Sequence, residues 1–417
     1  MSYVRRRWWR LFVVVSATGL ATVTFEIGLR VIDAQAAQLS LFVVEDLRGW
    51  ALRPGFKGWI ETEARVRVEI NRDGMRDRDH ALEKPAEIVR VAVLGDSFMQ
   101  GVNVPLEKTF ASFLERDLAG CAPTTSQPAE VLNFGVEGYG TAQELLTYRH
   151  RAARYRPDIV ILAVYTSNDI FNNHRALNER NDMPYFVLRN HQLQLEQPPG
   201  EAPAADVVPW YHAARMSLTS RSVTARLVWD GYALLRAPFV APQLVPIVRP
   251  DASVTERART LYDPVPAPMV RDEWALHRPP PRSVIDEAWA VTEALITALS
   301  REVAQHGAEF WLVTLSNSEQ VDPDVSKRTA MANRLGVEDL FYPDRRLHDF
   351  ATAQGIPVVS LAEPLAAYAA ANGVYLNGGY NEESPNGIGH WNEAANQLAA
   401  SMVGERLCAN SQRLAIQ

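Results

Sequence analysis

The chain has little cysteine and little glycine, and each scarcity excludes a class of protein. Only two of its 417 residues are cysteines, Cys121 and Cys408, so it carries no CxxC redox motif, zinc knuckle or dense disulfide framework. Glycine (23 residues) and proline (26 residues) are too few for a collagen-like or low-complexity chain. With 47% hydrophobic and 22% charged residues, the composition is that of a globular protein with a sizeable core.

Positive charge is also scarce beyond the first ten residues. Forty-two Lys and Arg face 49 Asp and Glu, and four of the basic residues stand within the first ten positions. The rest of the chain is therefore more acidic than the formal net charge of −7 indicates. Because a phosphate backbone requires a basic face, we expect no nucleic-acid partner.

The one long uncharged apolar run is Leu11–Phe25, which follows Trp8, Trp9 and the basic cluster. At 1.5 Å per residue, Trp8–Ile27 matches a hydrocarbon core of ~30 Å. We predict a membrane anchor over residues 1–33 in a bacterial inner membrane, with a cytoplasmic N-terminus and an exported body facing the periplasm or the outside. Cleavage of a signal peptide at Ala34–Ala36 and a buried helix of a soluble protein are the alternatives.

Residues 34–87 are predicted to form a membrane-proximal linker with short strands. Arg65–Ile70 alternates between polar and apolar residues, and Asn71–Gly74 is typical of a turn. No chemistry is expected in this stretch.

Residues 88–410 alternate between short apolar runs and helical patterns. Strands that are apolar on both faces belong to a covered parallel sheet. We therefore predict a doubly wound, flavodoxin-like α/β domain with helices on both faces and with ligands beyond the carboxyl ends of the strands. The predicted strands are Ile88–Leu94, Val131–Phe134, Ile159–Val164, Phe310–Leu315 and Ile356–Val359.

A proline-rich insertion is predicted at about 175–281 within this domain, with a hairpin over Tyr185–Leu195. Fourteen of the 26 prolines fall in 198–281, so regular structure there must be short. The insertion either covers the active site or is a surface elaboration without a direct role.

A serine follows the first predicted strand, in the tripeptide Gly95-Asp96-Ser97. The glycine permits a sharp turn, and the serine hydroxyl would then stand at the carboxyl edge of the sheet. A hydroxyl is a poor nucleophile without a base. The alternative is that Asp96 and Ser97 only cap the turn.

Three further signals follow later strands, and with them the sequence resembles the SGNH (GDSL) hydrolase family over most of residues 88–407. The resemblance implies a nucleophile at Ser97, oxyanion-hole donors at Gly138 and Asn168, and a base at His390. The family's usual Gly in the Asn block is Thr166 here. The matching stretches are GDS over Gly95–Ser97, VLNFGVEG over Val131–Gly138, TSND over Thr166–Asp169 and GHWN over Gly389–Asn392.

These residues also make chemical sense together. Attack on an ester carbonyl places negative charge on one oxygen, and the N–H of Ser97, the N–H of Gly138 and the amide of Asn168 would be three fixed donors for it. A glycine-permitted turn at Gly138 and an Asx-turn at Asn168 are the alternative interpretations.

The sequence departs from the family's pattern just before the histidine. Family members usually carry an Asp two or three residues upstream to orient the ring, whereas Gly387 and Ile388 stand there in this chain. A backbone carbonyl could hold the imidazole, or Glu382 or Glu383 could reach it from the preceding loop. An inactive member of the family is the third alternative.

The function expected from the sequence is that of a serine esterase acting on a small acyl ester, such as the O-acetyl groups of an envelope polysaccharide. An O-acyltransferase using the same acyl-enzyme, or an inactive glycan-binding envelope protein, remains open. No metal or organic cofactor is implied, because the chain has no P-loop, no HExxH and no dinucleotide fingerprint.

A disulfide between Cys121 and Cys408 is expected, with two buried thiols as the alternative. Cys121 closes the helix after the first strand, and Cys408 closes the last helix. In a flavodoxin-like order these two helices are neighbours with the same direction, and an exported compartment is oxidising.

Overall fold

The computed structural model describes most of the chain from residue 40 onward and a helix near the N-terminus. The described residues are 8–10, 12–14, 16–18, 20–21, 23–26, 40–121, 128–178, 180, 183–190, 192–196, 273–279, 284–382 and 384–410. Those from residue 41 onward form one compact unit, and the N-terminal helix belongs to a second unit.

The helix over Trp8–Glu26 is apolar and long enough to cross a membrane, the one such helix in the described part of the chain. A signal sequence near an N-terminus has the same properties. Residues 34–36, the candidate cleavage site, lie outside the described residues.

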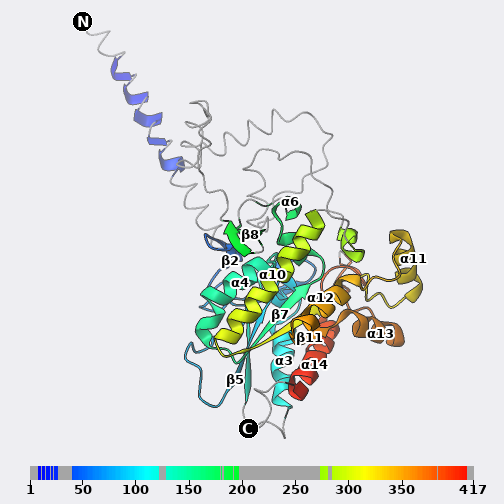
Figure 1. Cartoon of the computed structure of the whole chain (residues 1–417). Coiled ribbons are helices and arrows are strands. Elements are labelled where there is room, and N and C mark those ends of the chain that lie inside the picture. The colour runs from blue at the N-terminus through cyan, green and yellow to red at the C-terminus, as the bar shows by residue number, and fades with distance from the viewer. Residues whose placement is uncertain are drawn as a thin grey trace. The chain divides into compact units, whose positions relative to one another are not determined.

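A five-stranded parallel sheet forms the centre of the main unit, and the predicted fold class is confirmed (Figure 1). The strand order is β11-β10-β7-β5-β6, so the first strand of the sheet lies between the second and the third, as in a flavodoxin-like sheet. Each strand falls within two residues of its predicted position, and the central strands are buried along almost their whole length. The strands are β5 (Val89–Leu94), β6 (Ala129–Asn133), β7 (Ile159–Tyr165), β10 (Glu309–Leu315) and β11 (Val358–Ser360).

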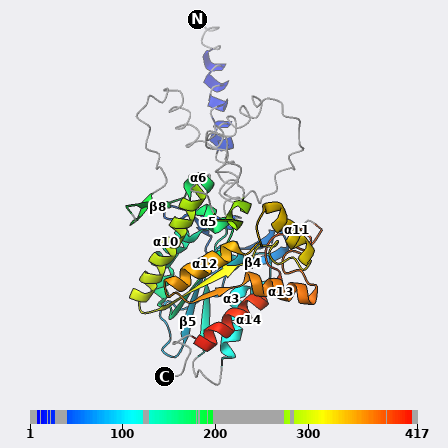
Figure 2. The same ribbon diagram turned by 45° about the vertical axis from the view of Figure 1, so that its right-hand side comes forward.

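Helices cover both faces of the sheet (Figures 1 and 2). One face packs against α3 (Phe110–Ala119), α13 (Ala362–Asn372) and α14 (Glu393–Asn410). The other face packs against α4 (Thr141–His150), α10 (Val284–Gln305) and α12 (Tyr342–Ala353). Further helices outside these layers are α2 (Ser97–Gln100), α5 (Asn168–Asn172), α6 (Arg175–Asn178) and α11 (Val325–Leu335).

Cys121 and Cys408 form a disulfide, with Cα atoms 5.6 Å apart. It joins the chain just after α3 to the last turn of α14. These helices lie side by side in both views, cyan and red, because α14 follows the last strand of the sheet and returns to the first helix (Figures 1 and 2). The bond therefore closes the α/β domain near its two ends.

The structure describes only parts of the predicted insertion. These are α6, a 3₁₀ helix over Glu273–His277 and the antiparallel hairpin of β8 (Tyr185–Arg189) and β9 (Gln192–Glu196), which was predicted. The greater part of 175–281 lies outside the described residues.

Residues 41–87, called the N-terminal segment below, pack against the α/β domain, whereas a linker was predicted for them. They form two antiparallel hairpins, one from β1 (Phe42–Glu45) and β2 (Gly49–Leu52), the other from β3 (Lys57–Glu61) and β4 (Arg65–Glu69). The inward residues of the hairpins share a third hydrophobic cluster with Val136 and Tyr139 of the α/β domain. The segment is therefore part of the same folded unit. The alternation in Arg65–Ile70 predicted the strand but not the surface that its apolar face covers.

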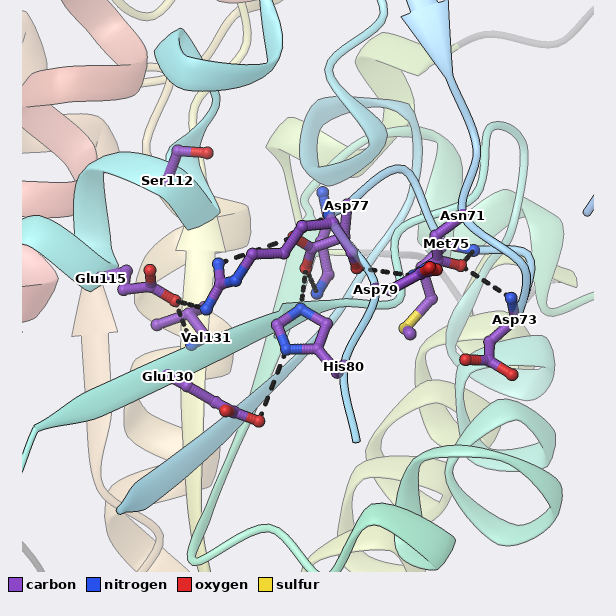
Figure 3. A network of polar contacts seen from close by, with 12 residues as sticks. Asn71, Asp73, Met75, Asp77, Asp79, His80, Ser112, Glu115, Glu130 and Val131 are labelled. Atoms are coloured by element: carbon purple, nitrogen blue, oxygen red, sulfur yellow. Dashed lines mark hydrogen bonds and ion pairs between the residues drawn. The ribbon is translucent and has the colours of Figure 1, made fainter. Parts of the chain in front are cut away.

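The end of this segment lies along the edge strand β6 (Figure 3). The carboxylate of Asp77 accepts the N–H of Asn133 at 3.0 Å, and Glu115 of α3 accepts the N–H of Val131 at 2.8 Å. His80 is buried between Asp77 and Glu130, with one ring nitrogen 3.1 Å and the other 3.4 Å from a carboxylate oxygen. Carboxylates therefore satisfy edge donors that would otherwise be open to another strand.

Candidate active site

Ser97 lies at the carboxyl end of β5, where the chain turns into α2. Asp96 caps this short helix, because its Oδ1 accepts the N–H of Phe98 at 2.9 Å. Gly95 leaves no room for a side chain, since a Cβ there would approach Cγ of Met99 to 2.5 Å. The turn thus presents the serine at the edge of the sheet where ligands of such folds bind.

His390 meets this serine from the opposite end of the chain. Its Nε2 is 2.7 Å from the Ser97 Oγ, although 293 positions separate the two residues. The imidazole lies in the loop before α14 and packs on the ring of Phe98, with ring centroids 4.9 Å apart. The distance is that of a hydrogen bond between a nucleophile and its base.

The other ring nitrogen of His390 contacts a carboxylate of the N-terminal segment. Oε1 of Glu63, at the tip between β3 and β4, is 2.7 Å from Nδ1. The same carboxylate accepts the backbone N–H of His390, at 2.9 Å through Oε2. Sequence reasoning expected no chemistry in residues 34–87, and Glu63 corrects that expectation.

Gly389 makes room for this carboxylate. Its φ is +86°, and a Cβ at this position would lie 2.5 Å from Oε1 of Glu63. Both the backbone conformation and the close approach therefore require glycine. A glycine directly before the histidine is the signal in the sequence that a group packs against this backbone.

The acids expected from the loop before His390 do not fill this role. Glu382 is exposed, and the Nδ1 of His390 faces Glu63 rather than a backbone carbonyl. Glu383 lies outside the described residues.

The histidine and the carboxylate shift each other's protonation. Burial alone would raise the pKa of Glu63, but the hydrogen bond and charge of His390 outweigh it, so the pKa lies below its usual range. Burial alone would lower the pKa of His390, but the hydrogen bond and charge of Glu63 raise it overall. The pair therefore favours an imidazolium next to a carboxylate, the state that forms when a histidine accepts a proton.

Gly138 lies in the loop that follows β6, and Asn168 is the first residue of α5, just after β7. Both are at the same edge of the sheet as Ser97. Gly138 has a φ of +77°, and its carbonyl accepts Nδ2 of Asn172 at 3.0 Å. Nδ2 of Asn168 is 3.4 Å from Oδ2 of Asp96, and the Ser97 Oγ is 3.5 Å from the same oxygen. The structure thus brings Asn168 and Ser97 to the same oxygen of Asp96 and places Gly138 at the same edge of the sheet.

Carboxylates lie behind this site without exposure to solvent. Burial raises the pKa of Asp96, and it raises the pKa values of Asp169 and Glu144 well above the usual range. Neither carboxyl oxygen of Glu144 has a hydrogen-bond partner. Buried carboxyl groups so close to one another stay protonated more readily than exposed ones.

The N-terminal segment also holds the turns around the nucleophile. Nε1 of Trp50 donates to the carbonyl of Glu137 at 2.9 Å, directly before Gly138. The buried guanidinium of Arg76 donates to the carbonyls of Gln100, Gly101 and Val104, at and just after the end of α2. Burial lowers the pKa of Arg76 to about 10, so it remains a cation at neutral pH.

The remaining described histidines with polar partners lie apart from this arrangement. His174, which follows Asn168 by six residues, pairs with Glu287 at 3.3 Å. His80 contacts Glu130 near the amino end of β6, the opposite edge of the sheet from Ser97. Among the described residues, no group of three or more His, Cys, Asp or Glu could hold a metal ion.

Comparison with known proteins gives likenesses in structure only. No family model and no curated protein matches the sequence. Similar solved structures include an acetyl xylan esterase (13% identity, 76% of this chain and 100% of that chain, TM-score 0.36). A catalytic mutant of an acetylxylan esterase from Geobacillus stearothermophilus is also similar (11%, 79% and 95%, TM-score 0.35).

A third similar structure is a candidate lipolytic protein of the G-D-S-L family from Desulfitobacterium hafniense DCB-2 (12%, 76% and 98%, TM-score 0.34). At this identity and TM-score the likenesses do not bear on the site. The chemistry of the site is therefore inferred from the geometry of this chain alone.

Proposed function

We propose that the protein is a serine ester hydrolase in which Ser97, His390 and Glu63 act as a catalytic triad. The observation that carries the proposal is the continuous pair of contacts at His390, 2.7 Å to Ser97 Oγ on one side and 2.7 Å to Glu63 Oε1 on the other. A serine, a histidine and a half-buried acid in this order form the arrangement that activates a hydroxyl for attack on an acyl carbon.

In the first half of the reaction, the Ser97 Oγ attacks the ester carbonyl while its proton passes to Nε2 of His390. Glu63 holds the ring through Nδ1 and stabilises the imidazolium. The negative charge on the carbonyl oxygen is met by the N–H groups of Ser97 and Gly138 and by the amide of Asn168. The C–O bond then breaks, and His390 returns the proton to the leaving alcohol.

In the second half, water attacks the acyl group on Ser97. His390 takes a proton from that water, the Ser97–acyl bond breaks, and the proton returns to the serine oxygen. The carboxylic acid leaves and the free site is restored.

The alternative of an inactive binding protein came from the missing Asp before His390. The contact of Glu63 with Nδ1 supports an active enzyme instead, because it gives the imidazole a carboxylate partner.

The substrate that we propose is a small acyl ester, an O-acetyl group on an envelope polysaccharide. The helix over Trp8–Glu26 supports a membrane location, with the N-terminus in the cytoplasm, the catalytic unit in the periplasm or outside and the anchor in the inner membrane. A disulfide in the catalytic unit fits an oxidising compartment.

Turnover of 4-nitrophenyl acetate and release of acetate from an acetylated polysaccharide test this proposal. The full chain, purified in detergent, is compared with Ser97→Ala and His390→Ala. We expect turnover by the wild type and a loss of at least ~10³-fold in both variants, since the nucleophile and its base act as a unit. Equal turnover by wild type and Ser97→Ala would contradict it.

Ser318→Ala is a suitable control for these variants. Ser318 is another serine beyond the carboxyl end of a strand, β10, and its hydroxyl contacts only the neighbouring Glu319 in the hydrogen bonds of the structure. Its turnover should equal that of the wild type.

A further inference from the structure

The loop after β6 carries a carboxylate that the proposed mechanism does not use, that of Glu137. This residue is solvent-exposed and directly precedes Gly138. Both sides of its backbone are fixed, because its N–H donates to Oε1 of Gln100 and its carbonyl accepts Nε1 of Trp50. The side chain is therefore attached to a rigid turn next to the proposed oxyanion donor.

Glu137 is the third carboxylate around the proposed base, after Glu63 and Asp96. Glu63 contacts the imidazole directly, and Asp96 lies 3.5 Å from the Ser97 Oγ. The pKa of Glu137 is raised, chiefly by loss of hydration in this loop; the charge of His390 opposes the increase, whereas Asp96 and Glu63 add to it. Three separate elements thus place carboxyl groups around one small site, and Glu137 is the exposed one among them.

The negative charge of Glu137 affects uncharged and anionic acyl groups differently. When Ser97 attacks, an imidazolium and an oxyanion form together, so the net charge of the site does not change. An uncharged acyl group adds nothing to this balance. A carboxylate on the acyl chain adds a negative charge that meets Glu137 without a counter-ion. Between partly solvent-exposed charges, such a repulsion lowers the rate by about fivefold to tenfold.

We propose that Glu137 is a specificity-determining residue that selects uncharged acyl groups over anionic ones at the Ser97 site. The proposal rests on the ester hydrolase function proposed above. It narrows the substrate class to esters whose short acyl group carries no charge, such as acetyl esters. It excludes half-esters of dicarboxylic acids, such as succinyl esters.

A matched pair of substrates tests this inference. Mono-(4-nitrophenyl) succinate and its methyl ester have the same acyl chain and leaving group and differ by one negative charge. The ratio of their kcat/KM values is measured for the full chain and divided by the ratio of their alkaline hydrolysis rates. We expect the wild type to prefer the methyl ester by about fivefold to tenfold.

Glu137→Gln should reduce this preference to below about twofold, because it removes the charge and keeps the shape. Glu382→Gln removes one negative charge from an exposed position in the loop before His390 and should leave the preference unchanged. The preference of the wild type should also weaken at high salt, as expected for partly exposed charges. Thermal unfolding of both variants shows whether they keep the fold.

Equal use of both esters by the wild type would overturn the inference. So would a preference that Glu137→Gln retains in full. If the wild type turns over neither ester and Ser97→Ala behaves the same, the proposed esterase function fails and the inference fails with it. Failure of the Glu137 inference alone can thus be distinguished from failure of the esterase function.

Discussion

The α/β domain and the N-terminal segment contribute to the site in different ways. The domain places Ser97 and Asn168 at the starts of the short helices that follow β5 and β7. It places Gly138 in the loop after β6 and His390 before α14. The segment supplies Glu63, which does not follow any strand of the parallel sheet. It reaches His390 across 327 positions because the hairpin of β3 and β4 packs onto the domain.

This difference shows which parts of a catalytic site topology supplies and which it does not. Parallel strands have their carboxyl ends at one edge of the sheet. The sheet topology alone therefore places the residues just after those strands close together. A residue on a docked hairpin is positioned only by tertiary packing. The predictions below therefore perturb the contribution of the N-terminal segment and leave Ser97 and the sheet intact.

The largest effect is expected for Glu63→Gln. The amide keeps the size of the side chain but cannot stabilise an imidazolium, and it allows the wrong tautomer of His390. We expect kcat for 4-nitrophenyl acetate to fall ~10³- to 10⁴-fold, as for loss of a triad acid. Glu61→Gln, two residues away on the exposed face of β3, is the matched control and should retain full activity. A fall of less than tenfold in Glu63→Gln would show that the domain acts without the segment.

A smaller loss is expected for Gly389→Ala, which replaces none of the three triad residues. The new Cβ would collide with the Glu63 carboxylate and displace it, so kcat should fall ~10²-fold. Gly373→Ala is the control, since Gly373 also has a positive φ (+63°) but its Cβ would meet no atom within 4 Å. Equal losses of activity in the two variants would mean that backbone strain, rather than Glu63, is responsible.

Trp50→Phe should have a milder effect. It removes the N–H that donates to the carbonyl of Glu137 but retains most of the apolar contact with Tyr139. We expect about 1 kcal/mol less stability from the lost hydrogen bond and a kcat reduced by less than about tenfold. Chemical denaturation and steady-state kinetics measure the two effects. An unchanged kcat would restrict the segment's contribution to Glu63.

The smallest effect is a shift in pH dependence. The base must be neutral, and the pKa of His390 is raised by Glu63, so kcat/KM should rise with pH with a midpoint above the usual imidazole value of ~6.5. Removing the carboxylate in Glu63→Gln removes this increase, and burial then lowers the pKa of His390. The midpoint in that variant should therefore move to lower pH. A midpoint that stays in place would show that another group titrates.

Much of the fold was accessible from the sequence because strands buried on both faces leave apolar runs. The runs before Gly95, Gly135 and Thr166 predicted β5, β6 and β7 and with them the positions of the loops. The motif at His390 and its place before the last helix predicted this residue as the base, and the structure brings its ring to Ser97. The disulfide followed from the strand order, which makes α3 and α14 neighbours.

Glu63 could not be predicted in this way. Its hairpin reads as a short amphipathic strand pair, and nothing in Arg65–Glu69 specifies which surface the apolar face covers. Two signals pointed to a distant acid without identifying it. One is the missing Asp before His390, and the other is Gly389, whose lack of a side chain leaves space for the carboxylate.

The rate at which a fluorophosphonate probe labels the full chain tests the central claim most directly, because labelling needs an activated serine and no particular substrate. Intact mass and peptide mapping follow the adduct in the wild type, Glu61→Gln and Glu63→Gln. The account predicts a single adduct on Ser97, formed equally fast in the wild type and Glu61→Gln and at least ~10²-fold more slowly in Glu63→Gln. Labelling of Glu63→Gln at the wild-type rate, or an adduct on another residue, would contradict it.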